Sequence, residues 1–397
     1  MARKGPLSEV RVIDLSQCWG GPFCGQLLGD LGAEVIKVEP PSGEVLRIDG
    51  WGKSGGIDIL ALNRNKKGIV LDLGTSSGME AFFDLVKVSD VVLDNLRPDA
   101  LEEIGANYKR LRNINPRVIY ASIVGYGSTG PYSKLPVYEH MAEGITGMAS
   151  ICCEPGEKPI VQPFPLAEFT AGSYLVYGIV TALFEQKRTG MGRIVEVNLL
   201  DASLQFMTLL FQMIFLLGRE PQPQGTRDPG VPVMGFYRCN DDNYIAVGPS
   251  WPRIARILDL EWMIEDPRWS SALTRVLNKQ EMSDWLEKEG FSKADAEDWL
   301  DILRLEDVPS HRINTLQQVL EDPQVIHNKA EISMEHPEYG KVRAIDCPIK
   351  IIGAFEGEHA PPPTLGEHTE EVLKTILGYS NEKIARINKE QEGLRSQ

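Results

Sequence analysis

The sequence lacks several features that would have placed it in a common class of protein. Its 397 residues carry 41 Lys and Arg against 56 Asp and Glu, a formal net charge of −15, with no continuous basic run. Phosphate neutralisation needs a basic face, so this balance argues against a nucleic-acid partner. No apolar run reaches the roughly 18 residues of a membrane span, since Asp201, Ser203 and Gln205 interrupt even the stretch 199–217. No membrane association is expected.

Cysteine and metal-binding patterns are also scarce. The six cysteines form no CxxC pair, and no secretory signal pattern is recognisable at the start of the chain. These features predict a reducing compartment and a cytoplasmic location. The sequence has no HExxH motif, and its six histidines do not pair with cysteines in a zinc pattern. No metal site is therefore expected.

The first third of the chain alternates short β-branched runs with helical patterns. This alternation is typical of βαβ units and of a parallel sheet with helices on both faces. The predicted fold class is α/β, with a doubly wound, Rossmann-like sheet, and the expected strands are 10–15, 33–39, 68–73, 90–96 and 117–127.

The remainder of the chain predicts a second, smaller domain. Helices at 138–149 and 167–187 lead to one more strand after Arg193, and the Pro/Gly/Gln-rich stretch 218–232 indicates a linker. A hairpin over 236–248, with Asp-Asp-Asn as its turn, precedes a helix-rich region. The expected division is a large domain at 1–217, the linker at 218–232, a small α/β domain at 233–335, and a segment at 336–397 that returns to the large domain.

Open parallel sheets hold ligands at the carboxyl ends of their strands, so the loops there are the first places to look for a site. The turn CWGGPFCG (18–25) follows the first strand but is not a GxGxxG fingerprint, which favours a tight turn over a dinucleotide site. Cations at 64–67 and 93–105 are either solvated charges or phosphate contacts.

One carboxylate stands out in the segment PLAEFTAGSYLVYG, because Glu168 begins an otherwise apolar helical run. An acidic residue in the first turn of a helix interacts favourably with the helix dipole. A carboxylate in this place can also serve as a nucleophile. The residues alone leave both interpretations open.

Long motifs across nearly the whole chain resemble the family III coenzyme A-transferases, the group that includes formyl-CoA:oxalate, carnitine and benzylsuccinate CoA-transferases and the related α-methylacyl-CoA racemases. The motifs include VIDLSQCWGGPFCGQLLGDLGAEVIKVEPPSGEVLR, LNRNKKGIVLDL, DVVLDNLRP, NPRVIYASIVGYGSTGPY, AEFTAGSYLVYGIVTALFEQKRTGMGRIVEVNLLDA and PPPTLGEHTEEVL. The resemblance implies a Rossmann-like large domain that binds CoA, a smaller α/β domain, and two chains threaded through each other as an interlocked dimer.

The resemblance also implies a chemistry. The family's nucleophile is an aspartate in an A-D-x-x-x-G segment, which falls here on residues 167–172 and puts Glu168 in the aspartate's place. The implied reaction moves CoA from an acyl-CoA thioester such as succinyl-CoA to an organic acid, through anhydride and thioester intermediates on the carboxylate. CoA would enter as a thioester substrate, with no permanently bound cofactor.

Further site residues follow from the same resemblance. It places Lys37, Arg47, Asn95, Leu96 and Arg97 near the adenine and diphosphate of CoA. It places Trp19, Tyr138 and Glu139 in the substrate pocket, where Trp19 stands in for a common glutamine and Glu139 for the aspartate of a Tyr-Asp pair.

Two alternatives remain open at this point. The clustered changes around Glu168 fit either a pocket adapted to glutamate or a non-catalytic subunit paired with an Asp-containing paralogue, so the partner is either a second copy or a paralogous chain. A third reading, an acyl-CoA racemase, requires a histidine in a Gly-His-Asp segment, and this chain has Val137-Tyr138-Glu139 there.

Overall fold

The computed structural model describes residues 4–49, 56–97, 99–223 and 225–395. Its residues form two compact units. The first unit comprises residues 1–146, 162–207 and 327–397, and the second comprises 147–161 and 208–326. Each unit has a hydrophobic core of its own. The division into domains at 217, 233 and 336 stays a prediction.

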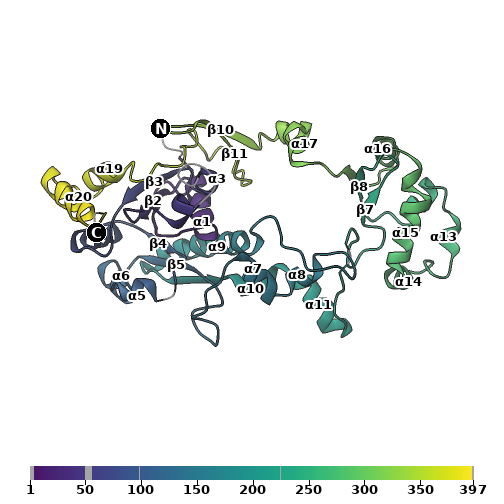
Figure 1. Ribbon diagram of the computed structural model, residues 1–397, viewed down its shortest axis with the longest axis horizontal. Helices are drawn as coiled ribbons and strands as arrows, with labels where there is room; N and C mark the ends of the chain where they lie inside the picture. The colour runs from purple at the N-terminus through teal and green to yellow at the C-terminus, as the bar shows by residue number, and fades with distance from the viewer. Residues whose placement is uncertain (1–3, 50–55, 98, 224, 396–397) are drawn as a thin grey trace. The chain divides into compact units, whose positions relative to one another are not determined.

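A six-stranded parallel sheet forms the centre of the first unit (Figure 1). Its order is β3-β2-β1-β4-β5-β6, which places the reversal of strand order between β1 and β4. The predicted α/β fold is confirmed. The strands are β1 (Arg11–Asp14), β2 (Glu34–Glu39), β3 (Lys66–Val70), β4 (Val91–Asp94), β5 (Ile119–Val124) and β6 (Ile194–Asn198).

The central strands are buried on both faces, which explains the apolar residues that dominate β1, β4 and β5. In β2 the charged Lys37 and Glu39 are also buried, each in an ion pair. Residues of β1 alternate between two cores: Val12 contributes to the one that also contains α9, and Ile13 to the one that also contains α4. The helices of this unit are α1 (Gly20–Asp30), α2 (Val45–Asp49), α3 (Gly56–Leu62), α4 (Ser76–Lys87), α5 (Ala100–Glu103), α6 (Tyr108–Ile114), α7 (Glu139–Ile145), α9 (Leu166–Thr189) and α10 (Leu199–Phe206).

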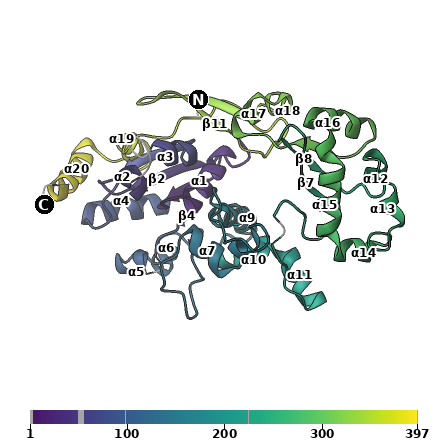
Figure 2. The ribbon, with the colours of Figure 1, turned by 45° about the vertical axis from the view of Figure 1, so that its right-hand side comes forward.

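The C-terminal residues belong to the first unit. They form the hairpin β10 (Glu331–His336) and β11 (Gly340–Ile345), followed by α19 (Thr369–Thr375) and α20 (Asn381–Arg395). Figure 2 shows α19 and α20 on the side of the sheet that carries α4. Val372 and Ile387 are fully buried in the core beneath α4, so the end of the chain closes this face of the sheet.

Helix α9 crosses from β5 to β6 and packs on the sheet and on α1. Its close contact with α1 requires glycine at 172, because a Cβ there would lie 2.6 Å from the carbonyl oxygen of Gly20. By length and composition alone α9 could span a membrane, but half of that apolar window is buried inside the protein, as in the core helix of a globular fold. Helices α10 and α11 (Thr208–Leu217) pass the same test only as a pair, bent by 67°.

The second unit contains a small antiparallel sheet and short helices. The predicted hairpin is present as β7 (Gly235–Arg238) and β8 (Tyr244–Val247), and β9 (Ser310–Arg312) pairs with β8. The core of this unit gathers aromatic side chains, including the fully buried Trp269, Tyr237 and Phe291. Its helices are α8 (Met148–Ile151), α11, α12 (Arg253–Ile257), α13 (Trp262–Glu265), α14 (Ala272–Leu277), α15 (Lys279–Glu289), α16 (Ala296–Leu305), α17 (Leu316–Glu321) and α18 (Pro323–His327, whose last residue falls in the first unit), with a 3-10 turn at Phe291–Lys293.

Candidate active site

Glu168 lies in the first turn of α9 and points at the start of α1. Its side chain is buried, with 7% of the residue exposed, and one carboxylate oxygen, Oε2, accepts a hydrogen bond of 3.0 Å from the backbone N–H of Gly20. Glycine at 20 makes this approach available, because a Cβ there would lie 2.5 Å from the same oxygen. The sheet thus brings together a carboxylate and a main-chain donor that are 148 residues apart in sequence.

A second carboxylate supports the beginning of α9. The two side-chain oxygens of Glu139 accept hydrogen bonds from the backbone N–H groups of Ala167 at 2.7 Å and Glu168 at 2.8 Å. These N–H groups belong to the first turn of α9 and have no partner within the helix, so Glu139 replaces the missing side-chain cap. Glu139 therefore fixes the backbone of Glu168 and is itself 2% exposed.

The surroundings of Glu168 favour the protonated form of its carboxyl more than solvent water does. Burial raises the pKa of Glu168 to about 7, and the nearby charge of Glu139 acts in the same direction, whereas the Gly20 N–H opposes the rise. Burial also raises the pKa of Glu139, against the lowering effect of its two backbone hydrogen bonds. The raised pKa brings the titration of Glu168 toward neutral pH in a desolvated site, a setting typical of reactive carboxylates.

The loop between β1 and α1 ends with Cys18 and Trp19, directly before the Gly20 donor at the start of α1. Cys18 has a φ of 60°, which is uncommon for a residue with a side chain. The indole Nε1 of Trp19 donates to the Asp58 carboxylate in α3 at 3.0 Å, so this predicted pocket residue is anchored and half-buried next to Gly20. Tyr138, the other predicted aromatic, precedes α7 and is 65% exposed.

Two of the cations that the resemblance places near CoA are engaged within the protein. Lys37 is fully buried in β2, where its ammonium lies 3.0 Å from a Glu44 carboxylate oxygen and donates to the Ser16 carbonyl at 2.9 Å. Arg47 in α2 binds the Glu39 carboxylate through two hydrogen bonds of 2.6 and 2.9 Å. Their roles toward CoA stay predictions.

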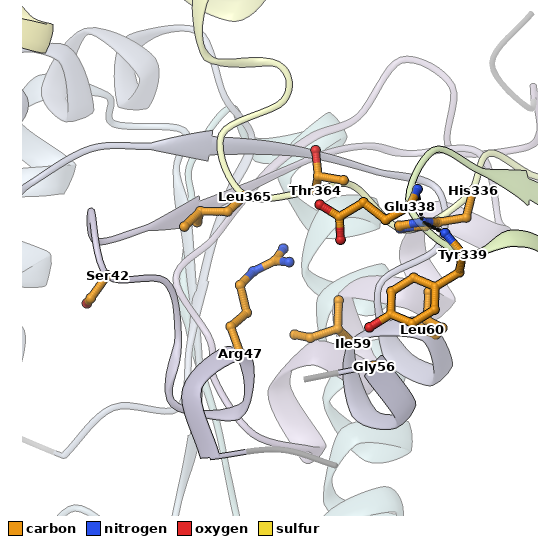
Figure 3. Close-up of a pocket in the computed structure, with 10 residues that line it drawn as sticks. All are labelled: Ser42, Arg47, Gly56, Ile59, Leu60, His336, Glu338, Tyr339, Thr364 and Leu365. Carbon is orange, nitrogen blue, oxygen red and sulfur yellow. Dashed lines mark hydrogen bonds between the residues drawn. The ribbon is translucent and has the colours of Figure 1, made fainter. Parts of the chain in front are cut away.

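Arg47 also borders a small polar cavity of about 230 Å³ between α2, α3 and the turn of the β10–β11 hairpin. Figure 3 shows its side chain rising from α2 between Ile59 and the segment of Thr364 and Leu365. The Tyr339 ring lies across the same cavity, near α3. Because Arg47 donates to Glu39 and to the Pro363 carbonyl, its charge is already compensated at this cavity wall.

The remaining predicted CoA contacts follow β4. Asn95 bonds the backbone of Gln17 twice, Leu96 is half-buried, and Arg97 is exposed. Arg97 lines a surface cavity of about 320 Å³ together with Lys134, whose side chain is 84% exposed. Sequence analysis missed Lys134, which lies 37 residues after Arg97 with no motif to link the two. The structure brings both cations to one cavity.

An apolar cavity of about 770 Å³ lies between α1, α3, α9 and β11. Phe23 and Phe169, whose rings stack at 4.3 Å, form part of its wall, and Phe169 follows Glu168 directly in the chain. In the part of the chain that the structure describes, no group of three or more metal-ligating side chains lies together.

The fold and the geometry define the chain as a doubly wound α/β protein with a buried, main-chain-bound carboxylate where α1 follows the first strand of the sheet. Comparison with known proteins identifies the family. Residues 7–369 match the model of CoA-transferase family III. The chain belongs to this family and is a CoA-transferase, a kind of enzyme that uses CoA thioesters as substrates.

Similar proteins cover almost the whole chain. A succinyl-CoA:glutarate CoA-transferase from Homo sapiens is 32% identical over 392 residues, covering 96% of this chain and 88% of that one. A succinate–glutarate CoA-transferase from Agrobacterium fabrum is 33% identical, covering 94% and 96%. The crystal structure of a CAIB/BAIF family protein from Brucella suis aligns with a TM-score of 0.82 and 29% identity, covering 94% and 100%.

Proposed function

We propose that the chain transfers CoA from succinyl-CoA to a dicarboxylic acid, with Glu168 as the nucleophile. A Glu168 oxygen attacks the thioester carbonyl, and the C–S bond breaks to give a mixed anhydride and CoA thiolate. The thiolate then attacks the Glu168 carbonyl, which releases succinate and leaves a glutamyl-CoA thioester. The acceptor carboxylate reverses the two steps, and the new acyl-CoA leaves with Glu168 restored.

One observation carries this proposal: the buried Glu168 carboxylate receives a main-chain N–H bond at the carboxyl edge of the sheet. An oxygen of Glu168 bears negative charge in the ionised enzyme and again in each tetrahedral intermediate formed at its carboxyl carbon. The Gly20 N–H is preorganised to stabilise that charge. Desolvation makes the ionised carboxylate a stronger nucleophile, at the cost of the fraction that is protonated near neutral pH.

The substrate class rests on the relatives. The human and Agrobacterium fabrum proteins are named for succinate and glutarate, which are both dicarboxylic acids. On the CoA side, the exposed Arg97 offers a charge-assisted contact for a phosphate group. Lys134 lies 3.5 Å from Asp99 at the same cavity and would have to leave that carboxylate to offer a second contact. We assign the reaction to the cytoplasm and expect it to need no permanently bound cofactor.

Trapping the intermediate tests the role of Glu168. The purified chain is incubated with succinyl-CoA and then with hydroxylamine, which converts an activated carboxyl into a hydroxamate. Peptide mass spectrometry should find the modification on Glu168 and on no other carboxylate. The Glu168→Gln variant, treated alike, should show none.

An unmodified Glu168 in a preparation that transfers CoA would contradict the proposal. An unmodified Glu168 in an inactive chain, with activity appearing only when an Asp-containing paralogue is added, would identify this chain as the non-catalytic subunit instead. A deuterium exchange assay at the α-carbon of a chiral 2-methylacyl-CoA distinguishes a racemase from a CoA-transferase. A racemase exchanges the α-proton with solvent, whereas CoA transfer leaves that proton in place.

We further propose that two copies of the chain assemble as the interlocked dimer implied by the family resemblance. Large apolar side chains stay exposed on helices of both units: Tyr177 and Phe184 of α9 are 74% and 78% exposed, and Leu209 and Phe215 of α11 are 78% and 75% exposed. Tyr177 and Phe184 are seven residues apart, close to two helical turns, so they lie on one face of α9, and an exposed apolar helix face is typical of an interaction site. Light scattering of the purified protein should give twice the 44.2 kDa chain mass, and a monomer at micromolar concentration would contradict the proposal.

A further inference from the structure

The backbone of three consecutive residues before α1 is bound by side chains from β2, from the turn that follows β2 and from the residue after β4. The Ser16 carbonyl accepts from Lys37 Nζ at 2.9 Å. The N–H and C=O of Gln17 bond Asn95 at 2.8 and 2.7 Å. The Cys18 N–H donates to Glu44 Oε2 at 3.0 Å. We call Lys37, Glu44 and Asn95 the loop clamp.

Two of these side chains form a buried ion pair. Lys37 and Glu44 lie 3.0 Å apart, with 0% and 1% of their side chains exposed. Removing two charges from water has a desolvation penalty that can equal or exceed the attraction between them, so a buried ion pair contributes little to stability. The pair is explained better by the geometry that it imposes on the loop. Burial alone would lower the pKa of Lys37, but the carboxylates of Glu44, Asp14 and Glu39 raise it, so the lysine stays charged.

Glu39, on the same strand as Lys37, holds the backbone of Glu44 in place. Glu39 Oε2 accepts from the Glu44 backbone N–H at 3.1 Å, and the same carboxylate binds Arg47. Lys37 is thus surrounded by compensated carboxylates and points at the loop. Its ammonium is enclosed within the sheet, and a CoA phosphate would have to displace Glu44 to reach it.

The loop needs such support because its conformation is unfavourable on its own. Cys18 adopts a φ of 60°, which costs free energy in a residue with a side chain and persists only where surrounding contacts enforce it. Its N–H bond to Glu44 is one of those contacts. Two residues later, the Gly20 N–H meets Glu168 at 3.0 Å, so the position of this donor depends on the clamped backbone.

We infer that Lys37, Glu44 and Asn95 are positioning residues, which set the Gly20 N–H against the Glu168 carboxylate instead of contacting CoA. This inference rests on the proposed role of Glu168. It assigns to Lys37 and Asn95 a task different from the CoA contact that the family resemblance implies. It also assigns a task to Glu44, on which sequence analysis was silent.

The clamp has a consequence that a purely structural role would not have. The Gly20 N–H lowers the pKa of Glu168, while burial and the Glu139 carboxylate raise it, and the Cys18 thiol also faces this charge. If the clamp is removed and the loop moves, Glu168 loses the Gly20 N–H that lowers its pKa. Burial and the Glu139 carboxylate, which raise the pKa, remain. The midpoint of the pH dependence of kcat/KM should then move upward.

The informative variant removes the ion pair without leaving one charge unpaired. Lys37→Met combined with Glu44→Leu should lower kcat roughly 100-fold, a loss typical of a small misplacement at a reacting centre. KM for succinyl-CoA should stay within about threefold, and the pH midpoint should rise. Lys37→Met combined with Glu44→Gln also leaves neither charge of the pair unpaired, but it keeps an acceptor for the Cys18 N–H and should recover part of kcat.

The matched control replaces an ion pair that also includes a residue of β2. Lys67 of β3 pairs with Glu34 of β2 at 3.0 Å, and both side chains are partly exposed. Lys67→Met with Glu34→Leu should leave kcat and the pH midpoint unchanged. If the clamp double variant does not fold, Asn95→Leu tests the same inference, because it releases Gln17 without altering a buried charge.

Two results would overturn the inference. A raised KM for succinyl-CoA with unchanged kcat and pH midpoint would make the clamp residues CoA contacts. A lowered melting temperature with unchanged kcat and midpoint would make them structural. Glu168→Gln, assayed in parallel, distinguishes failure of the proposed nucleophile from failure of the loop clamp. If Glu168→Gln is active, Glu168 is not the nucleophile. If Glu168→Gln is inactive while the clamp variants behave like the wild type, only the inference about the loop clamp is refuted.

Discussion

Replacing Glu168 with glutamine lowers kcat for CoA transfer by roughly 10⁴-fold or more, the scale seen when a covalent nucleophile is removed. The amide has the size of the carboxylate and can still accept the Gly20 N–H, so the surrounding structure is kept. It cannot form an anhydride with the acyl group. The measurement is steady-state conversion of succinyl-CoA and glutarate to glutaryl-CoA, followed by chromatography of the CoA esters.

The control for this variant lies on the same helix. Glu185→Gln removes a carboxylate near the other end of α9, where it pairs with Arg193 at the surface, and should leave kcat within about twofold. A Glu168→Gln enzyme with activity within tenfold of the wild type would show that this carboxylate is not the nucleophile. Circular dichroism and the melting temperature of both variants verify that the fold is retained.

The central sheet could be predicted from the sequence because its strands are buried on both faces. β4 begins with an unbroken apolar run, Val91 to Leu93, and β2 carries the β-branched residues Val35, Ile36 and Val38; both strands form within a few residues of their predicted bounds. The last helix, α20, was missed. Its sequence is largely polar and buries few apolar residues, Ile384 and Ile387 among them, which is too weak a periodicity to separate it from a solvated tail.

The site residues that could be predicted are those with a local signal in the sequence, and those that could not be predicted depend on tertiary contacts. Glu168 could be singled out because one carboxylate in an apolar helical run is a local feature of the sequence. The donor from Gly20 and the capping of α9 by Glu139 could not, because both depend on how α1, α7 and α9 meet in space. The surroundings of Lys37 were equally inaccessible, since its partner Glu44 becomes a neighbour only through the turn that follows β2.

The buried carboxylate also predicts a pH-dependent stability that is independent of catalysis. The pKa of Glu168 is raised from its ordinary value near 4.5 to about 7, chiefly by burial, so the folded protein holds this proton more tightly than the unfolded chain. The free energy of unfolding therefore falls as pH rises from about 4.5 through 7, and the loss is complete above that range. Over this span the loss amounts to about 3 kcal/mol.

Glutamine at 168 cannot ionise, so Glu168→Gln should escape that loss. We expect the variant to match the wild type near pH 4 and to exceed it by up to about 3 kcal/mol above pH 8. Urea unfolding at a series of pH values measures the difference, with Glu9→Gln, an exposed site, as the control that should show no trend. If the difference in free energy of unfolding between the two proteins does not grow with pH, the Glu168 carboxylate is solvated. The desolvation that makes it an effective nucleophile would then be absent.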